Sequence, residues 1–199
     1  MATDKHEAME IIRAEVLNLK ASPLYTYRTE NNYFPVIGEG SHTASIMFIG
    51  EAPGKNEAKT ARPFCGRAGQ ILDELLSTIG LPRESVYITN IVKDRPPANR
   101  DPSPDEIALY GSFLDRQIDI IRPRVIATLG RFSMWYILQK YEVPERLDTI
   151  SKLHGQVIAV QSPHGPMSVV ALYHPAAAIY NQSLKDTLKK DFSVLKRFI

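Results

Sequence analysis

The sequence has one cysteine, Cys65, among its 199 residues. A single thiol cannot form an internal disulfide, and it cannot supply the several cysteine ligands of a zinc site or an iron–sulfur cluster. A chain this poor in cysteine is typical of a reducing compartment, so we expect a cytoplasmic, intracellular protein. Any cofactor would have to be held by other groups, and we expect no cofactor and no metal.

Long apolar runs are also missing. No stretch approaches the roughly 18 uncharged apolar residues of a membrane span, and the first twenty residues carry charges that signal peptides lack. We therefore expect no membrane partner and no secretion. The excess of positive charge is small, at 24 Lys and Arg residues against 22 Asp and Glu, so composition alone does not indicate a nucleic-acid-binding protein.

The sequence does contain enough apolar residues, 44% of the chain, for one well-packed core. A chain of this length predicts a single domain over residues 1–199, and we expect a monomer. Short apolar runs predict four strands, and residues 156–160 could add a further one. The four strands are expected at residues 45–49, 86–91, 125–129 and 168–172.

Segments with helical spacing of apolar residues lie around and between these strands, and residues 21–43 look irregular. The clearest helix starts at Ser103, where Pro104 and Glu106 complete a capping box. The alternation of strands and helices predicts a three-layer α/β/α fold with a central, mostly parallel four-stranded sheet. Helices are expected at residues 4–20, 70–79, 103–123, 131–141 and 183–198.

Three polar side chains follow or end predicted strands. Glu51 comes after the first strand, Asn90 ends the second, and His174 comes after the last. Ligands of open α/β sheets bind beyond the carboxyl ends of the strands, so these side chains should meet at one rim. Each alone is more often a loop carboxylate, a strand-end turn or a structural histidine. The first turn is not a phosphate-binding loop, because the spacing from Gly50 to Lys55 is one residue short.

Five sequence blocks in order carry a resemblance to a known family. They are GEAPG at 50–54 with Glu57, RPFCGRAG at 62–69, TNIVK at 89–93 with RPPANR at 95–100, LG at 129–130, and HPAA at 174–177. Together they resemble family 4 uracil-DNA glycosylases, from about Val16 to the C-terminus. The resemblance implies an enzyme of base-excision repair that flips uracil out of DNA, hydrolyses its N-glycosidic bond and leaves an abasic site.

The chain departs from this family at the four positions where its members carry cluster-binding cysteines. The chain has Leu19, Ser22, Asp94 and Tyr110 there, and none of these side chains is a thiolate, so a four-iron cluster cannot form. In the family the cluster is structural, so we still expect activity. We expect Leu19 and Tyr110 to make an apolar contact and Asp94 to pair with a nearby base.

The resemblance implies roles in uracil binding for three residues. Asn90 would donate to uracil O4 and accept from N3–H, which cytosine could not match. Phe64 would stack on the flipped base, although core packing is an alternative for its ring. His174 would be catalytic, donating a hydrogen bond to the negative charge that develops at uracil O2.

The group that activates water is left open by the sequence. Some related families use a carboxylate or an amide at the position of Ala52, which has no proton chemistry here. We therefore expect Glu51 to be the second catalytic residue, orienting or activating water, with Ala52, Pro53 and Glu57 as further uracil-binding residues. Gly54 stands where other families place a tyrosine against uracil C5, so thymine would be rejected less strictly.

Two segments are expected to contact DNA. Lys93, Arg95 and Arg100 would bind phosphates, with an ordinary polar loop as the alternative. Residues of the loop after His174 would enter the minor groove and fill the vacated stack, with either of the last two as the wedge; a helix start would explain the same apolar residues. These loop residues are Ala177, Ile179 and Tyr180.

Two other functions remain open. The first is a non-catalytic DNA- or partner-binding module on a glycosylase scaffold, which the missing cluster and the weak net charge favour. The second is a small-molecule α/β enzyme that uses the same rim, for example on free nucleosides.

Overall fold

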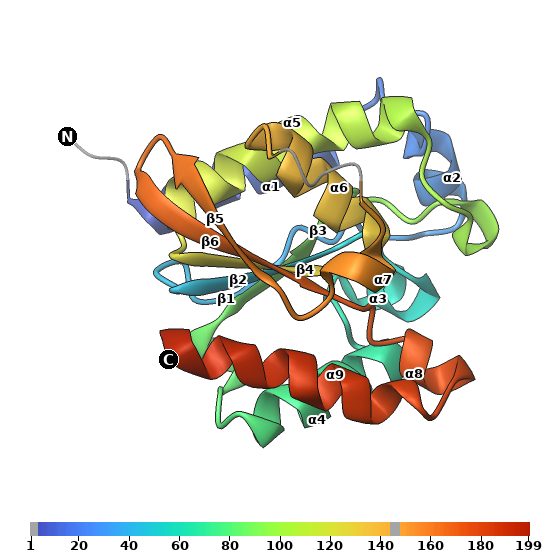
Figure 1. The fold of residues 1–199 in the computed structure, drawn as a ribbon. Coiled ribbons are helices and arrows are strands. Elements are labelled where there is room, and N and C mark those ends of the chain that lie inside the picture. The colour runs from blue at the N-terminus through green and yellow to red at the C-terminus, as the bar shows by residue number, and fades with distance from the viewer. Residues whose placement is uncertain (1–3, 144–147) are drawn as a thin grey trace.

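A six-stranded sheet lies between two layers of helices in the computed structural model, which describes residues 4–143 and 148–199 (Figure 1). The strand order is β1-β3-β2-β4-β6-β5. The four inner strands are parallel, and both edge strands are antiparallel to their neighbours. The inner strands are β2 (Ile46–Gly50), β3 (Tyr87–Asn90), β4 (Val125–Leu129) and β6 (Gly165–Leu172); the edges are β1 (Glu39–Gly40) and β5 (Val157–Ser162).

The predicted number of four strands is therefore wrong, and the predicted parallel character holds only for the inner strands. β5 is the further strand that residues 156–160 suggested, and it pairs with β6 through a tight hairpin. β1 has only two residues and no apolar run, so hydrophobic patterning could not reveal it. Its pairing depends on a contact with β3, which lies far along the chain.

The helices cover both faces of the sheet (Figure 1). One layer consists of α1 (Lys5–Leu17), α2 (Tyr25–Glu30), α5 (Pro104–Ile121) and α6 (Arg131–Lys140). The other consists of α4 (Arg67–Thr78), α8 (Ala177–Tyr180) and α9 (Leu184–Ser193) with the following 3₁₀ turn Val194–Phe198. The short helices α3 (Lys55–Thr60) and α7 (Ile150–Leu153) lie beside the sheet, and two more 3₁₀ turns span Arg83–Ser85 and Pro97–Asn99. The three predicted layers and all five expected helices are confirmed.

The start of α5 shows how local sequence fixes an element. The Ser103 hydroxyl accepts a hydrogen bond from the Glu106 amide, and the Glu106 carboxylate accepts one from the Ser103 amide at 2.8 Å. Pro104 occupies the first helical position, where its missing N–H costs nothing. These bonds satisfy amides that would otherwise lack partners, and they set where the preceding loop joins the helix.

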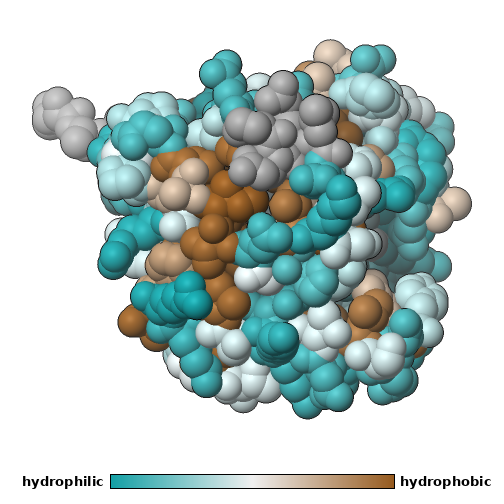
Figure 2. Space-filling view, in the orientation of Figure 1, coloured by the Kyte–Doolittle hydropathy of each residue, from teal (hydrophilic) through white to brown (hydrophobic). Residues whose placement is uncertain are grey.

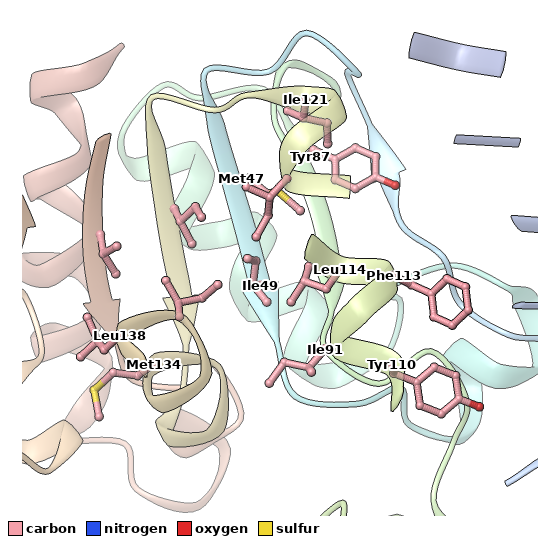
Figure 3. Close-up of a cluster of buried hydrophobic side chains, with 14 of the residues drawn as sticks. Met47, Ile49, Tyr87, Ile91, Tyr110, Phe113, Leu114, Ile121, Met134 and Leu138 are labelled. Carbon is pink, nitrogen blue, oxygen red and sulfur yellow. The ribbon is translucent and has the colours of Figure 1, made fainter. Parts of the chain in front are cut away.

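Alternate residues of the inner strands point to opposite faces and build two cores. Met47 and Ile49 of β2 pack with α5 and α6 side chains in one core, which Figure 3 shows. Ile46 and Phe48 face the other core, beneath α4 and α9. Burying each large side chain contributes roughly 1.5–3 kcal/mol, and burial on both faces explains why the inner strands are continuous apolar runs.

Polar residues cover most of the molecular face seen in Figure 2, but a band of apolar residues crosses the region where β5 and β6 lie in Figure 1. The side chains of β5 are only partly buried, as expected for an edge strand. Within the described ranges, no helix has the length and apolar character that crossing a bilayer requires.

Candidate functional site

A pocket of about 360 Å³ lies at the carboxyl ends of the inner strands. The chain passes from β2 to β3 on one side and then to β4 on the other, so this rim is where the strand order reverses. Ligand sites of open α/β sheets form at such a point. All seven predicted uracil-binding residues line the pocket: Glu51, Ala52, Pro53, Glu57, Phe64, Asn90 and His174.

Asn90 ends β3 and is 2% exposed. Its side-chain oxygen Oδ1 is buried and has no hydrogen-bond partner in the described structure. A Cβ atom on the neighbouring Gly50 would lie 2.3 Å from this oxygen and 2.7 Å from Cζ of Phe64, so only glycine allows both side chains to approach the strand end. An unpaired buried oxygen is costly unless a ligand supplies the donor.

Phe64 lines the pocket with its backbone in the left-handed region, at φ 48°. Such a conformation is unfavourable for a large residue and is held by its surroundings. A Cβ atom on Gly69 would lie 1.8 Å from the Phe64 carbonyl oxygen, so glycine lets α4 approach this turn. The Phe64 ring lies 5.6 Å from the His174 ring, centroid to centroid. The two rings therefore lie next to each other in the lining of the pocket.

Glu57, on α3, holds the turn that carries Phe64. Its Oε1 accepts hydrogen bonds from the amides of Cys65 and Gly66, at 3.0 and 2.9 Å. Gly66 is the N-cap of α4, so a carboxylate also lies at the positive end of that helix. In this structure Glu57 therefore orders the wall of the pocket.

His174 follows β6, and its bonding defines a tautomer. Nδ1 accepts a hydrogen bond from the Ala176 amide at 3.1 Å. Burial lowers the pKa of His174 to about 4, although the charge of Glu57 opposes this shift. The ring is therefore neutral at pH 7, and because Nδ1 accepts, its proton is on Nε2. Nε2–H remains as a donor for a ligand.

Glu51 follows β2 and lines the same pocket. Burial raises its pKa to about 7; the charge of Asp101 raises it further, and the charge of Arg131 lowers it. Asp101 and Arg131 form an ion pair of 2.6 Å with each other. A carboxyl group with a pKa near 7 is suited to accept a proton at neutral pH.

The three predicted phosphate-binding residues lie in different environments. Arg100 lines the pocket and is exposed, and it forms an ion pair of 2.6 Å with Glu106. Arg95 is half-buried and donates to the hydroxyl groups of Tyr27 and Tyr33. The prediction for Lys93 is wrong, because this side chain is fully buried and cannot reach a DNA phosphate.

The predicted wedge loop forms α8, beside the pocket. Ala177 and Ile179 are partly exposed, and Tyr180 is 88% exposed. Ala178 is buried and anchors the turn from below. A helix start and an exposed apolar loop therefore occur together here, although the sequence suggested them as alternatives.

The structure also adds residues that the sequence did not single out. Asn99, Ala68 and Pro96 line the pocket. Asn99 and Pro96 lie inside the RPPANR block, so a closer reading of that block could have found them. Arg131 and Asp101 act on Glu51 through their charges, and no sequence signal links residues 50 positions or more apart.

Hydrogen bonds link the residues at the four positions where the family carries cluster-binding cysteines. The Tyr110 hydroxyl donates to Asp94 at 2.6 Å and lies 2.6 Å from the Ser22 hydroxyl. Arg28 pairs with Asp94 at 3.0 Å, which confirms the expected basic partner, and the two side chains are 5% and 0% exposed. Leu19 packs against the core that contains Tyr110, and its direct contact with Tyr110 stays a prediction.

These residues do not fit an iron–sulfur cluster. They offer a phenol, an alcohol, a carboxylate and an alkyl chain, whereas such clusters are held by thiolates. Burial raises the pKa of Asp94, while the bonds from Tyr110 and Arg28 oppose the rise. No group of three or more His, Cys, Asp or Glu side chains in the described part of the chain is arranged to hold a metal ion.

Comparison with known proteins places this pocket in context. Residues 37–196 match the model of the uracil DNA glycosylase superfamily. The chain is 45% identical to a type-4 uracil-DNA glycosylase of Sulfurisphaera tokodaii over 96% of this chain and 84% of that protein. It is 42% identical to the type-4 enzyme of Archaeoglobus fulgidus, over 94% and 90% of the two chains. The corresponding protein of Thermotoga maritima is 41% identical over 98% and 96%.

Proposed function

The chain belongs to the uracil DNA glycosylase superfamily, and we propose that its rim pocket binds a uracil flipped out of DNA and cleaves the bond to its sugar. It is a uracil-DNA glycosylase, a hydrolase of DNA base-excision repair. One observation carries the assignment of the pocket: the buried Oδ1 of Asn90 lacks a partner in the pocket that His174 also lines. An acceptor from Asn90 and a donor from His174 in one pocket match the polar edge of a pyrimidine.

Asn90 selects the base. Its Oδ1 accepts from uracil N3–H and its amide nitrogen donates to O4, and cytosine presents the opposite pattern at these two positions. A wrong base would leave the buried oxygen unpaired, which costs about 1–3 kcal/mol. Phe64 supplies an apolar surface for the ring, and Ala52, Pro53 and Glu57 complete the walls.

His174 stabilises the leaving group. When the glycosidic bond breaks, its electron pair goes to N1 of uracil, and the negative charge extends to O2. Nε2–H of the neutral imidazole donates to that oxygen. A neutral donor is fixed in place before the reaction, so it stabilises the charge without needing to reorganise.

Glu51 acts on water at the sugar. The water oxygen bonds to C1′ as the base departs, and the Glu51 carboxylate takes the proton released from the water. A pKa of about 7 leaves a large fraction of Glu51 unprotonated at neutral pH, yet makes it basic enough to take that proton. The polar walls of the pocket and the flipped sugar determine where this water lies.

DNA contacts surround the pocket. Arg100 is exposed at its edge and binds a phosphate next to the flipped nucleotide. Tyr180 is the wedge that fills the vacated stack, because it is the most exposed apolar side chain of α8. Ala177 and Ile179 contact the minor groove of the DNA beside this wedge. We also propose that residues 1–199 form one domain and that the protein is a cytoplasmic monomer.

Cleavage of labelled uracil-containing oligonucleotides, followed by alkali to break abasic sites, tests the proposal. The parent protein should release uracil, and Asn90→Ala should lose most of this activity while remaining folded. Free deoxyuridine should be a poor substrate, because the DNA contacts would be missing. Equal activity on free deoxyuridine would favour a nucleoside enzyme, and normal DNA binding without cleavage would favour a non-catalytic module.

A further inference from the structure

Lys93 is a fully buried lysine three residues beyond the end of the pocket strand β3. Its side chain folds back, and its Nζ donates to three oxygen atoms. These are the Asn90 carbonyl oxygen at 2.7 Å, Gln117 Oε1 at 2.6 Å and Thr89 Oγ1 at 2.9 Å. No carboxylate of the described residues forms an ion pair with this lysine. Neither water nor an ion pair therefore stabilises the Lys93 amino group, so its burial needs another explanation.

The bonding of the three oxygen atoms requires Lys93 to donate to each of them. The hydroxyl proton of Thr89 is already donated to the Ile37 carbonyl at 2.6 Å. The amide nitrogen of Gln117 donates to the same carbonyl and to the Tyr87 hydroxyl, which leaves Oε1 to face Lys93. Three acceptors need three N–H donors, and only the ammonium form has three.

The cost of this arrangement indicates a specific task. Burial lowers the pKa of Lys93 well below its ordinary value, because an ammonium group without water is unfavourable. A methionine would fill much of the same volume without a charge. The lysine is tolerated because all three of its donors are used, and one of the three bonds holds the residue that lines the pocket.

The bond to Asn90 fixes the end of the strand. After Asn90, the amides of Ile91 and Val92 still bond to the carbonyls of Gly50 and Glu51, both at 3.0 Å. The amide oxygen of the Asn90 side chain has no protein partner of its own. Its direction must therefore be set by its backbone and by packing, and Lys93 holds that backbone through the carbonyl group.

We infer that Lys93 is a positioning residue for uracil recognition, which clamps the Asn90 peptide and so aims the Asn90 amide into the pocket. The inference rests on the proposed role of Asn90. It replaces the expected contact between Lys93 and DNA phosphate with a role inside the protein. It also explains why a lysine just beyond the pocket strand β3 is fully buried and makes no contact with solvent.

A double-mutant cycle tests the inference, with 5-fluorouracil as the probe and fluorine NMR titration as the measurement. Lys93→Met should weaken binding of the probe about tenfold, because a misdirected amide loses roughly the worth of a hydrogen bond. In an Asn90→Ala background, Lys93→Met should have no further effect, since it acts only through Asn90. Affinity for an oligonucleotide with an abasic-site analogue should change little.

The control is Leu138→Ala, which changes a buried residue of α6 and leaves the hydrogen-bond partners of Lys93 in place. It should lower stability without weakening 5-fluorouracil binding. If Lys93→Met weakens binding equally in both backgrounds, or not at all in the parent, the inference is wrong. If Asn90→Ala itself leaves binding unchanged, the proposed role of Asn90 fails first. Should Lys93→Met not fold, Lys93→Gln, which keeps two N–H donors, carries the same cycle.

Discussion

Replacing His174 by alanine removes one defined hydrogen-bond donor from the pocket. The ring is neutral, with a pKa of about 4, and Nδ1 is occupied by the Ala176 amide, so Nε2–H is the only donor that the change removes. Loss of one such donor to a developing oxyanion costs about 10² to 10³ in rate, or roughly 2.7–4 kcal/mol. We therefore expect single-turnover cleavage of uracil-DNA to fall by about that factor.

The assay should separate chemistry from binding. Cleavage is measured with enzyme in excess over a labelled duplex, and affinity with an abasic-site analogue that cannot react. His174→Ala should change affinity little, because DNA binding depends mainly on phosphate contacts. The factor by which His174→Ala lowers the cleavage rate should also be the same from pH 5 to pH 8. The imidazole, with a pKa of about 4, does not change its charge in that range.

Tyr173→Phe is the matched control for damage to the loop. Tyr173 adjoins His174 in sequence, but its ring packs at a tilt against the ring of His154, with centroids 4.5 Å apart, and it is not among the residues that line the pocket. Its replacement should leave the cleavage rate near that of the parent. A folded His174→Ala protein that cleaves within a factor of about three of the parent would refute the donor role.

Four further outcomes are expected. Asn90→Asp should lower uracil cleavage and allow trace cytosine excision, because a carboxylate accepts from cytosine N4 but repels uracil O4; a parental rate on uracil duplexes would contradict this. The parent rate should rise with pH up to about 7 and then level off, as Glu51 loses the proton that its raised pKa retains, and Glu51→Gln should abolish this dependence in a single-turnover pH series. Arg28→Met should lower the free energy of unfolding in urea by about 3–5 kcal/mol, since it leaves Asp94 buried without its cation, and adding Asp94→Asn should restore part of that loss. Purified protein should be colourless, and metal analysis showing about one cluster per chain would refute the assignment of the four substituted positions.

Much of the fold could be predicted from the sequence because local signals and burial agree there. The capping box at Ser103 fixes the start of α5, and both-sided burial makes β2 and β4 continuous apolar runs. The edge strands were harder to predict from the sequence. β1 has neither length nor an apolar pattern, and its two residues become a strand only because β3 lies beside them.

The pocket was predictable where a side chain ends a strand or follows it within two residues, as with Glu51, Asn90 and His174. The prediction failed where the direction of a side chain depends on tertiary structure. Lys93 looked like a phosphate-binding residue of a polar loop, but Thr89 and Gln117 provide acceptors inside the protein. Gln117 is on α5, 24 residues away, and no short-range pattern could indicate that contact.

The buried pair of Arg28 and Asp94 changes how this enzyme depends on its surroundings. Arg28 also donates to the carbonyls of Val16 and Leu17 at the end of α1, so the pair joins the N-terminal helix to the loop after β3. This joint consists of a guanidinium, a carboxylate and the hydroxyl groups of Ser22 and Tyr110. None of these groups requires a metal cluster to be inserted. The joint therefore depends only on side chains and carbonyl groups of the chain itself, and loss or oxidation of iron cannot break it.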